Sequence, residues 1–229
     1  QGGKVIVPAF AVGRTQDLVY ALHRLVRAQK LPDLPIYVDS PLAVNVTEIF
    51  RLHTECFDEE TRAFIDSEGT SDPFGFRRLR YIRDSEDSKE LNFLRDPAVI
   101  ISASGMAETG RILHHLRNNI GDPNSTILFV GFQAENTLGR RLLDGVSPVR
   151  IFGEAHTVRA TIERVEGFSA HGDRRDLLEW VGRMERPRLR QVFLVHGEPE
   201  SANALADGIR QLGIANVAVP ALHEGFELT

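Results

Sequence analysis

The chain has 229 residues, of which 42% are hydrophobic and 26% are charged, as is usual for a globular protein. No apolar run is long enough to span a bilayer, and no secretory signal opens the sequence. The formal net charge of −5 argues against a nucleic-acid binder that relies on overall positive charge, although a local basic cleft is still compatible with it. The single cysteine, Cys56, rules out a disulfide framework and a cysteine-based zinc cage within the chain, and it favours a reducing, cytoplasmic location.

Short β-rich apolar runs alternate with amphipathic stretches along the whole sequence. Strands are predicted at 4–10, 35–40, 97–102, 126–131 and 190–196. Helices are predicted at 15–29, 41–53, 107–120, 136–145, 173–185 and 200–213, with Thr15 capping the first, Pro41 opening the second and Gly145 closing the fourth. This alternation indicates an α/β fold with a mostly parallel sheet.

Three regions are harder to assign from the pattern. The polar segment 54–95 is expected to hold short helices at 58–66 and 87–94. Residues 148–165 suggest a hairpin-like β segment, and "NVAVPA" (216–221) and "FELT" (226–229) complete the chain. Because the chain begins with Gln1 and enters an apparent buried strand almost at once, we expect it to be a piece of a longer protein.

Polar residues follow four of the predicted strands directly. In an open α/β sheet, ligands bind at the carboxyl ends of the strands, so these residues are expected to line one edge. Ordinary polar turns would explain any single case, but four together favour a site. The residues in these positions are Asp39 and Ser40, then Ser102, Ser104 and Gly105, then Gly131, Phe132 and Gln133, and finally His196, Gly197 and Glu198.

Three loops of small residues precede helices, and each carries an arginine. They are "PAFAVGRTQ" (8–16), "SASGMAETGR" (102–111) and "GFQAENTLGRR" (131–141), with Arg14, Arg111 and Arg140 respectively. Backbone N–H groups together with a guanidinium suit a phosphate group. Each loop alone also fits a solvated surface arginine.

Two histidine motifs carry the strongest chemical signal. In "VHGE" (195–198), His196 stands at a strand end, where one ring nitrogen could bind a metal, and Gly197 is expected to form the tight turn. In "FSAHGD" (168–173), His171 precedes a helix that Asp173 can cap, and Ser169 offers a hydroxyl. His171 is a candidate general acid near a phosphate, although each motif alone also fits a plain turn or cap.

The neighbouring histidines His114 and His115 lie within the predicted helix 107–120. Adjacent positions on a helix point about 100° apart, so the two rings cannot face one ligand. We interpret both as structural or surface residues.

Six motifs taken in order resemble the β-CASP metallo-β-lactamase ribonucleases. They are "VIVPAFAVGRTQDLVYAL", "PIYVDSPLA", "SASGMAETGRILHHL", "VGFQAENTLGRRL", "GFSAHGDRRDLLEW" and "LVHGE". The resemblance implies a nuclease in which a β-CASP cassette, here residues 1–167, clamps single-stranded RNA over a metallo-β-lactamase domain. Residues 168–229 would be the C-terminal part of that αββα domain.

The same resemblance assigns roles to the two histidines. His171 would lie by the scissile phosphate and assist the leaving group, and His196 would bind one of two zinc ions, which activate water and stabilise charge on the phosphate. The family's main zinc motif, H-x-H-x-D-H, does not occur in these 229 residues. We therefore expect the chain to lack the N-terminal half of the metallo-β-lactamase domain and a complete zinc site. The sequence leaves the oligomeric state open, and a homodimer is one alternative.

Two alternatives remain open at this point. One is a non-catalytic RNA-binding or scaffold module of the same family, which the presence of both His171 and His196 disfavours. The other is an α/β domain acting on a small nucleotide, which has little support because the sequence lacks G-x-x-x-x-G-K-[ST] and a clean G-x-G-x-x-G.

Overall fold

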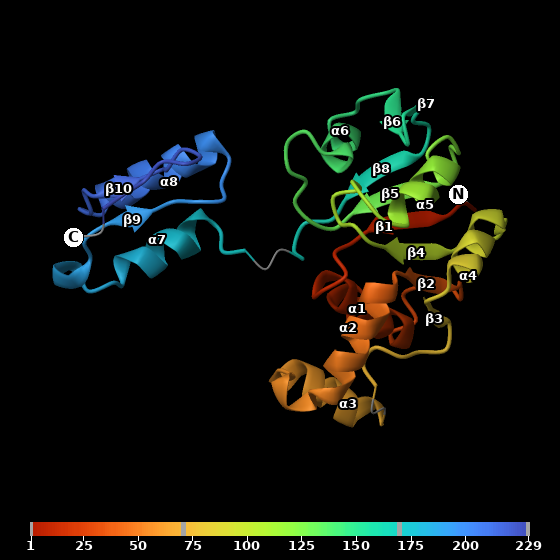
Figure 1. The fold of residues 1–229 in the computed structure, drawn as a ribbon. Helices are drawn as coiled ribbons and strands as arrows, with labels where there is room; N and C mark the ends of the chain where they lie inside the picture. Colours follow the sequence, from red (N-terminus) through yellow and green to blue (C-terminus); the bar gives the residue numbers. More distant parts are fainter. Residues whose placement is uncertain (1, 70–71, 169–170, 228–229) are drawn as a thin grey trace. The chain divides into compact units, whose positions relative to one another are not determined.

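The computed structural model describes residues 2–69, 72–168 and 171–227 (Figure 1). The chain forms two compact units, residues 1–169 and 170–229. Each unit has its own sheet and its own hydrophobic core. Within the described ranges, every helix is too short or too polar to act as a membrane span.

The first unit is built on a parallel sheet. Among the described residues, this sheet has six strands in the order β3-β2-β4-β1-β5-β8, and every pair of neighbours runs parallel. All six carboxyl ends therefore lie at one edge of the sheet, as Figure 1 shows. The strands are β1 (Val5–Pro8), β2 (Ile36–Asp39), β3 (Leu79–Ile82), β4 (Val99–Ser102), β5 (Thr126–Phe129) and β8 (Thr161–Arg164).

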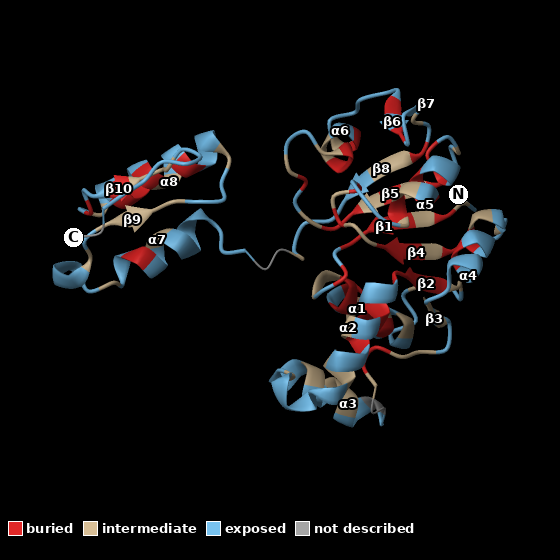
Figure 2. Cartoon of the chain, in the orientation of Figure 1, coloured by how far each residue is buried: buried red, intermediate tan, exposed pale blue. Residues whose placement is uncertain are grey.

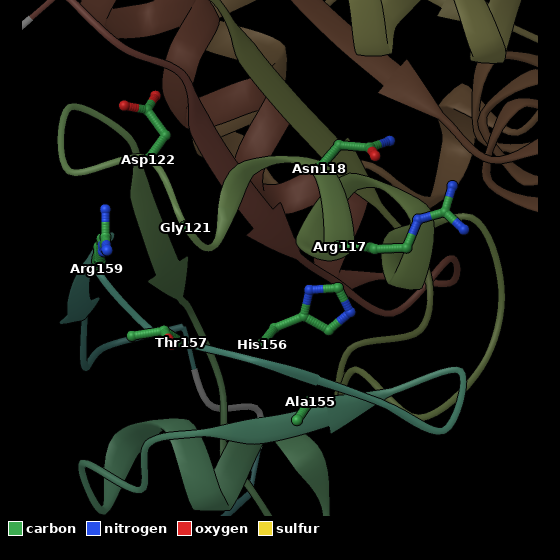
Figure 3. A pocket seen from close by; sticks show the side chains of 8 residues that line it. All are labelled: Arg117, Asn118, Gly121, Asp122, Ala155, His156, Thr157 and Arg159. Atoms are coloured by element: carbon green, nitrogen blue, oxygen red, sulfur yellow. The ribbon is translucent and has the colours of Figure 1, made fainter.

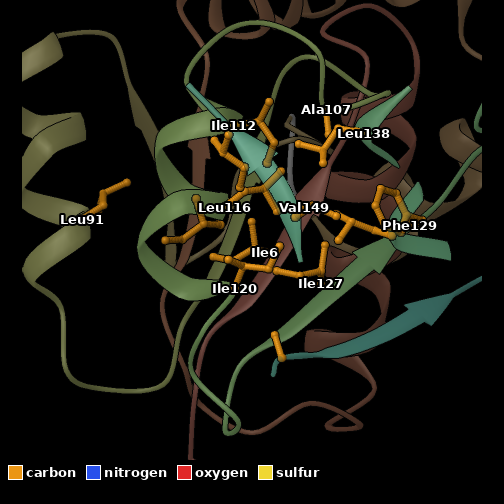
Figure 4. Close-up of a cluster of buried hydrophobic side chains, with 14 of the residues drawn as sticks. Ile6, Leu91, Ala107, Ile112, Leu116, Ile120, Ile127, Phe129, Leu138 and Val149 are labelled. Atoms are coloured by element: carbon orange, nitrogen blue, oxygen red, sulfur yellow. The ribbon is translucent and has the colours of Figure 1, made fainter. Parts of the chain in front are cut away.

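Helices cover both faces of this sheet. Successive strand side chains point to opposite faces, so Ile6 and Ile100 join one buried cluster while Val7 and Ile101 join the other. The first cluster packs under α5, α6 and the β6–β7 hairpin (Figure 4), and the second packs under α1 and α2. The bounds are α1 (Arg14–Arg27), α2 (Pro41–Leu52), α5 (Ile112–Asn119), α6 (Leu138–Leu143), β6 (Val149–Ile151) and β7 (Glu154–His156).

The burial of these strands explains their stability. The central strands β1, β2 and β4 are almost entirely buried in Figure 2, and their apolar runs match the two-sided burial of a parallel sheet. Each fully buried Ile or Phe contributes about 1.5–3 kcal/mol relative to an exposed position. The segment between β2 and β4 also holds η1 (Thr54–Cys56), α3 (Glu59–Glu68), α4 (Ser85–Glu90) and η2 (Leu91–Phe93).

The second unit is smaller. It contains α7 (Arg174–Gly182), η3 (Arg186–Arg188), β9 (Val192–Phe193), α8 (Pro199–Gln211) and β10 (Val217–Ala218). The two short strands pair in parallel, and a small core of Val181, Ala206 and Ile209 lies between the helices and this pair. Asp173 caps α7 in a capping box with Asp176, as the sequence predicts.

The structure corrects two predicted helix starts. The helix expected at 15–29 begins at Arg14, and Thr15 is not its cap, because the Thr15 hydroxyl donates to the Phe10 carbonyl instead. The helix expected at 107–120 begins only at Ile112, because residues 103–111 form a loop at the sheet edge. The predicted start of α2 at Pro41 and the left-handed Gly145 after α6 are confirmed.

The β assignments also change in three places. Strand β3 occupies a segment where only helices were predicted. Residues 149–156 form the expected hairpin, but 161–164 leave it and join the main sheet beside β5. Residues 226–227 form no strand, and 228–229 lie outside the described residues.

Candidate functional site

A cavity of about 510 Å³ opens at the carboxyl edge of the main sheet. It is lined by three loops that follow β1, β2 and β4, namely residues 10–11, 39–42, and 103–104 with 109–111. Its volume falls within the roughly 300–1,000 Å³ typical of small-ligand sites. The site therefore stands where the sheet topology predicts a ligand.

Asp39 forms the base of this cavity and is 0% exposed. Its Oδ2 accepts hydrogen bonds from Ser88 Oγ and His115 Nε2, both at 2.6 Å, and its Oδ1 accepts one from Arg111 Nη1 at 2.7 Å. Burial alone would raise the pKa of Asp39, but the hydrogen bonds from His115, Ser88 and Arg111 outweigh burial and lower this pKa below its ordinary value. The buried carboxylate is thus ionised and fully engaged at neutral pH.

Arg111 is the cationic group of the cavity. Its Nη2 donates to the Arg83 carbonyl at 2.7 Å, so two bonds fix the guanidinium plane. The side chain is 21% exposed, and a guanidinium has five N–H donors, so some remain for a ligand. Phe10 and Leu42 form the apolar walls and are 46% and 59% exposed. A cation beside an exposed aromatic ring can bind a phosphate group together with a stacked base.

Three predicted residues lie at the cavity in other roles. Ser40 lines the cavity, and its hydroxyl accepts from the Ala43 N–H at 3.3 Å, which caps α2. Ser104 Oγ accepts from the backbone N–H groups of Glu108 and Thr109, each at 3.2 Å. Ser102 is buried beneath the cavity and donates to the Asp39 carbonyl at 2.8 Å.

Gly105 and Gln133 lie behind the cavity, where two loops are joined. The Gln133 side chain is buried and donates to the Gly105 carbonyl at 3.0 Å. A Cβ on Gly139 would come within 1.8 Å of Gln133 Oε1, so a side chain at that position would push the loops apart. The Glu108 carboxylate accepts from the Leu138 N–H and ties the same loops together.

Arg14 and Arg140, the other two arginines predicted to bind a phosphate group, do not line this cavity. Arg14 pairs with Asp17 at 3.0 Å and lies 5.8 Å from the ring centre of Phe168. Arg140 pairs with Asp144 on the outside of α6. Ser169 lies outside the described residues.

The two motif histidines lie in the second unit, and both are exposed. His171 stands two residues before the capping residue Asp173 of α7. His196 follows β9 with φ 65°, so the left-handed residue of this turn is His196 and not Gly197 as the sequence suggested. A non-glycine residue in that region is uncommon and is often found at functional sites. Pro199 opens α8, one residue before the predicted start at 200.

Zinc sites use three or four nitrogen, sulfur or oxygen ligands from the protein. Across the described ranges, no three His, Cys, Asp or Glu side chains come close enough together to hold a metal ion.

A second cavity, of about 440 Å³, lies before the amino ends of β5 and β8 (Figure 3). Arg117, Asp122, His156 and Arg159 are among its lining residues. The Arg117 and Arg159 side chains point in different directions in Figure 3, and Arg117 lies 5.6 Å from the ring centre of Phe152. This cavity does not collect charged groups around one point, in contrast to the carboxyl edge.

Sequence reasoning missed His115 and Ser88. His114 and His115 do point apart as predicted, since His114 packs against Phe152 while His115 is fully buried. The available signal was the helical spacing of Ile112, His115, Leu116 and Asn119, which puts His115 on the buried face, where it needs a polar partner. No local signal marks Ser88.

Comparison with known proteins matches two domain families to the chain. A sequence model of the Beta-Casp domain matches residues 15–142, and one described as a Zn-dependent metallo-hydrolase RNA specificity domain matches residues 155–220. The chain is 39% identical to Ribonuclease TTHA0252 of Thermus thermophilus over 206 residues, which cover 90% of this chain and 46% of that protein.

Archaeal proteins are similar as well. The transcription termination factor FttA of Pyrococcus abyssi is 34% identical over 224 residues, covering 95% of this chain and 34% of FttA. An RNase J-like protein of Methanocaldococcus jannaschii is 32% identical over 197 residues, covering 86% and 44% of the two chains. The chain thus spans less than half the length of these relatives.

Proposed function

Because this chain belongs to the β-CASP family of metallo-β-lactamase ribonucleases, we propose that it supplies the RNA-contacting surface of a zinc-dependent endoribonuclease. The proposed reaction is hydrolysis of a phosphodiester bond in single-stranded RNA. The chain would also contribute two residues, His171 and His196, to the reaction centre of the whole protein.

The observation that carries the proposal is that the fixed guanidinium of Arg111 and the exposed ring of Phe10 line the same cavity. A phosphate group is the ligand that suits a planar cation with open N–H groups, and an aromatic wall suits a base of any sequence. Single-stranded RNA offers both at once, because its bases are unstacked and reachable.

His196 would act as a ligand of one of two zinc ions, with the remaining ligands supplied by the part of the whole protein that this chain does not span. When bound, the zinc ions would supply hydroxide from water and neutralise negative charge on the phosphate. His171 would donate a proton to the leaving oxygen. Ser169, which precedes it in the same motif, is a further candidate contact to the RNA backbone.

The test uses the full-length protein that contains this chain and a labelled single-stranded RNA oligonucleotide. Binding and cleavage are measured over a range of salt concentrations for the wild type and Arg111→Ala, with and without a zinc chelator. We expect cleavage that the chelator abolishes. We expect weaker RNA binding by Arg111→Ala, with a salt slope smaller by about 0.7 for one lost phosphate contact.

Arg140→Ala is the matched control, because Arg140 is ion-paired on α6 away from the cavity. Salt-dependent RNA binding without any cleavage would replace the nuclease by a scaffold function. Tight binding of free nucleotides with no binding of oligonucleotides would indicate a small-molecule site.

A further inference from the structure

We propose that Asp39 and His115 are positioning residues that hold the Arg111 guanidinium in place for RNA, an inference that rests on the function proposed above. Neither side chain can reach a ligand directly, because both residues are 0% exposed. Both are linked to Arg111 through a single carboxylate. Their effect on RNA would therefore pass through Arg111.

The two oxygens of the Asp39 carboxylate have different partners. Oδ2 accepts from Ser88 Oγ on α4 and from His115 Nε2 on α5, both at 2.6 Å. Oδ1 accepts from Arg111 at 2.7 Å. Because two helices hold Oδ2, the direction of Oδ1 is fixed, and the guanidinium bound to Oδ1 is fixed with it.

The geometry shows which ring nitrogen of His115 donates to Asp39. An ionised carboxylate only accepts hydrogen bonds, so His115 must donate from Nε2. Its Nδ1 is buried and has no hydrogen-bond partner among the described residues. Asp39 and Arg111 form an ion pair, and the hydrogen bond from His115 holds the carboxylate of that pair at Oδ2.

The open N–H groups of Arg111 connect this network to RNA. Two donors of the guanidinium bind Asp39 and the Arg83 carbonyl, and the others are available at the cavity. A long side chain that is held before RNA arrives loses less conformational freedom on binding. The ordering cost of one such side chain corresponds to a change of about 2- to 12-fold in the dissociation constant.

Two substitutions of His115 separate donation from packing. His115→Leu fills a similar space and removes the donor, whereas His115→Gln keeps an N–H that can reach Asp39. RNA dissociation constants are measured by fluorescence anisotropy on the full-length protein, with a chelator present so that cleavage does not compete. We expect His115→Leu to weaken binding by about 2- to 12-fold and His115→Gln to restore most of the loss.

A double-mutant cycle with Arg111→Ala distinguishes positioning from a general loss of structure. If His115 acts through Arg111, His115→Leu has no further effect on binding in the Arg111→Ala background. Multiplying effects in the double variant, or a folded His115→Leu protein that binds RNA like the wild type, would overturn the proposal. If His115→Leu does not fold, the same cycle with Ser88→Ala gives the decision, because Ser88 also binds Oδ2.

The same measurements separate this inference from the proposed function. Unchanged RNA binding by Arg111→Ala would show that Arg111 makes no phosphate contact. That result would overturn both the proposed function of the cavity and the positioning role. Weaker binding by Arg111→Ala, together with unchanged binding by His115→Leu, would leave the RNA site standing and overturn only the positioning role.

Discussion

The carboxyl edge of the main sheet and the histidine turns of the second unit hold their polar side chains in opposite ways. At the sheet edge, Asp39 is fully buried and accepts three side-chain hydrogen bonds, which fix Arg111 at the cavity. In the second unit, His196 is exposed and left-handed, and no cluster of possible metal ligands surrounds it in the described ranges.

Under the proposed function, the chain would complete the site at the sheet edge and would contribute only single residues to the metal site. Burial, several donors and fixed geometry make the sheet edge ready to bind before a ligand arrives, which is how affinity is gained through preorganisation. A metal ligand needs its other ligands and the ion itself to gain a fixed environment. Substitutions made in one region at a time show whether the other region changes its activity or stability.

The largest expected effect is on the histidine side. In the full-length protein, His196→Ala should lower zinc-dependent RNA cleavage by at least about 100-fold, since loss of even an outer-shell partner of a metal costs roughly 10–100-fold. RNA binding in the presence of a chelator should be nearly unchanged, because Arg111 is not altered. Cleavage rates and zinc content per protein are the measurements.

His223→Ala is the matched control for that experiment. His223 also lies in the second unit, is exposed and has a left-handed φ of 68°, so both substitutions place Ala in a similar left-handed backbone. Equal losses of cleavage in both variants would point to a general disturbance of the second unit and remove the special role of His196.

The next effect is on the stability of the sheet edge. Gly110 has φ 87°, and a Cβ there would come within 2.5 Å of the Ala103 carbonyl oxygen. Gly110→Ala should lower the free energy of unfolding of the first unit by about 2–4 kcal/mol, from a strained φ and a backbone clash together. All three tyrosines, Tyr20, Tyr37 and Tyr81, lie in the first unit, so their fluorescence in a Trp180→Phe background follows its urea unfolding.

Gly121→Ala serves as the control for Gly110→Ala. Its added Cβ would meet only the Thr157 carbonyl oxygen, at 3.9 Å, which is an ordinary contact. The change should stay within about 0.5 kcal/mol. Comparable losses in the two variants would show that the loop 103–111 adapts more readily than its backbone geometry indicates.

The elements of the first unit show what can be predicted from the sequence and what cannot. The central strands are predictable because two-sided burial leaves apolar runs such as "KVIV" and "AVII". The edge strand β3 was missed because it is only partly buried, so its "LRYI" shows no such run. The start of α5 was missed because tertiary contacts, such as the Gln133–Gly105 bond, hold residues 103–111 as a loop.

The location of the candidate site could be predicted from the sequence, but the hydrogen bonds between its residues could not. Polar residues after strands correctly placed Asp39, Ser40 and Ser104 at one edge, and the loop 102–111 brings Arg111 to it. The prediction that His196 follows a strand of the same sheet was wrong, because β9 pairs with β10 in the second unit. The network that joins them uses Ser88 and His115, which lie 49 and 76 positions from Asp39 along the chain. No local pattern relates residues so far apart, and only the folded chain brings them together.

Acid should weaken the first unit through Asp39. Its pKa is lower in the folded protein than its ordinary value of 3.8, so its stabilising contribution is present above about pH 3.8 and is lost as the pH falls below that value toward the folded pKa. Asp39→Asn should remove this part of the pH dependence. Urea unfolding of the first unit, followed by tyrosine fluorescence between pH 2.5 and 7, measures it.

Other carboxyl groups of the first unit also have lowered pKa values, so the comparison must be made between variants. Arg78 lowers the pKa of Asp33 to about 2, and Ser125 lowers that of Asp122. Both remain in Asp39→Asn, so the difference between the two pH profiles isolates the share of Asp39. Parallel pH profiles for wild type and variant would mean that Asp39 binds its proton equally well in the folded and the unfolded state.

The smallest expected effect concerns the second unit alone. Asp173 Oδ1 accepts from the Asp176 N–H at 2.9 Å and completes the capping box of α7. Asp173→Ala removes this acceptor, and loss of an ordinary cap should lower the thermal midpoint of a unit of this size by about 4–8 °C. Trp180 is the only tryptophan of the chain and lies in α7, so its fluorescence reports this transition.

Asp84→Ala is the control, because Asp84 stands at the N-cap of α4 but makes no capping hydrogen bond. It should leave the Trp180 transition unchanged and shift the tyrosine transition very little. If Asp173→Ala also lowered the tyrosine transition, the two units would unfold together, and the sheet edge would depend on the histidine side for its stability. Separate transitions would mean that the proposed RNA-binding edge is stable within the first unit, which is what its internal hydrogen bonds predict.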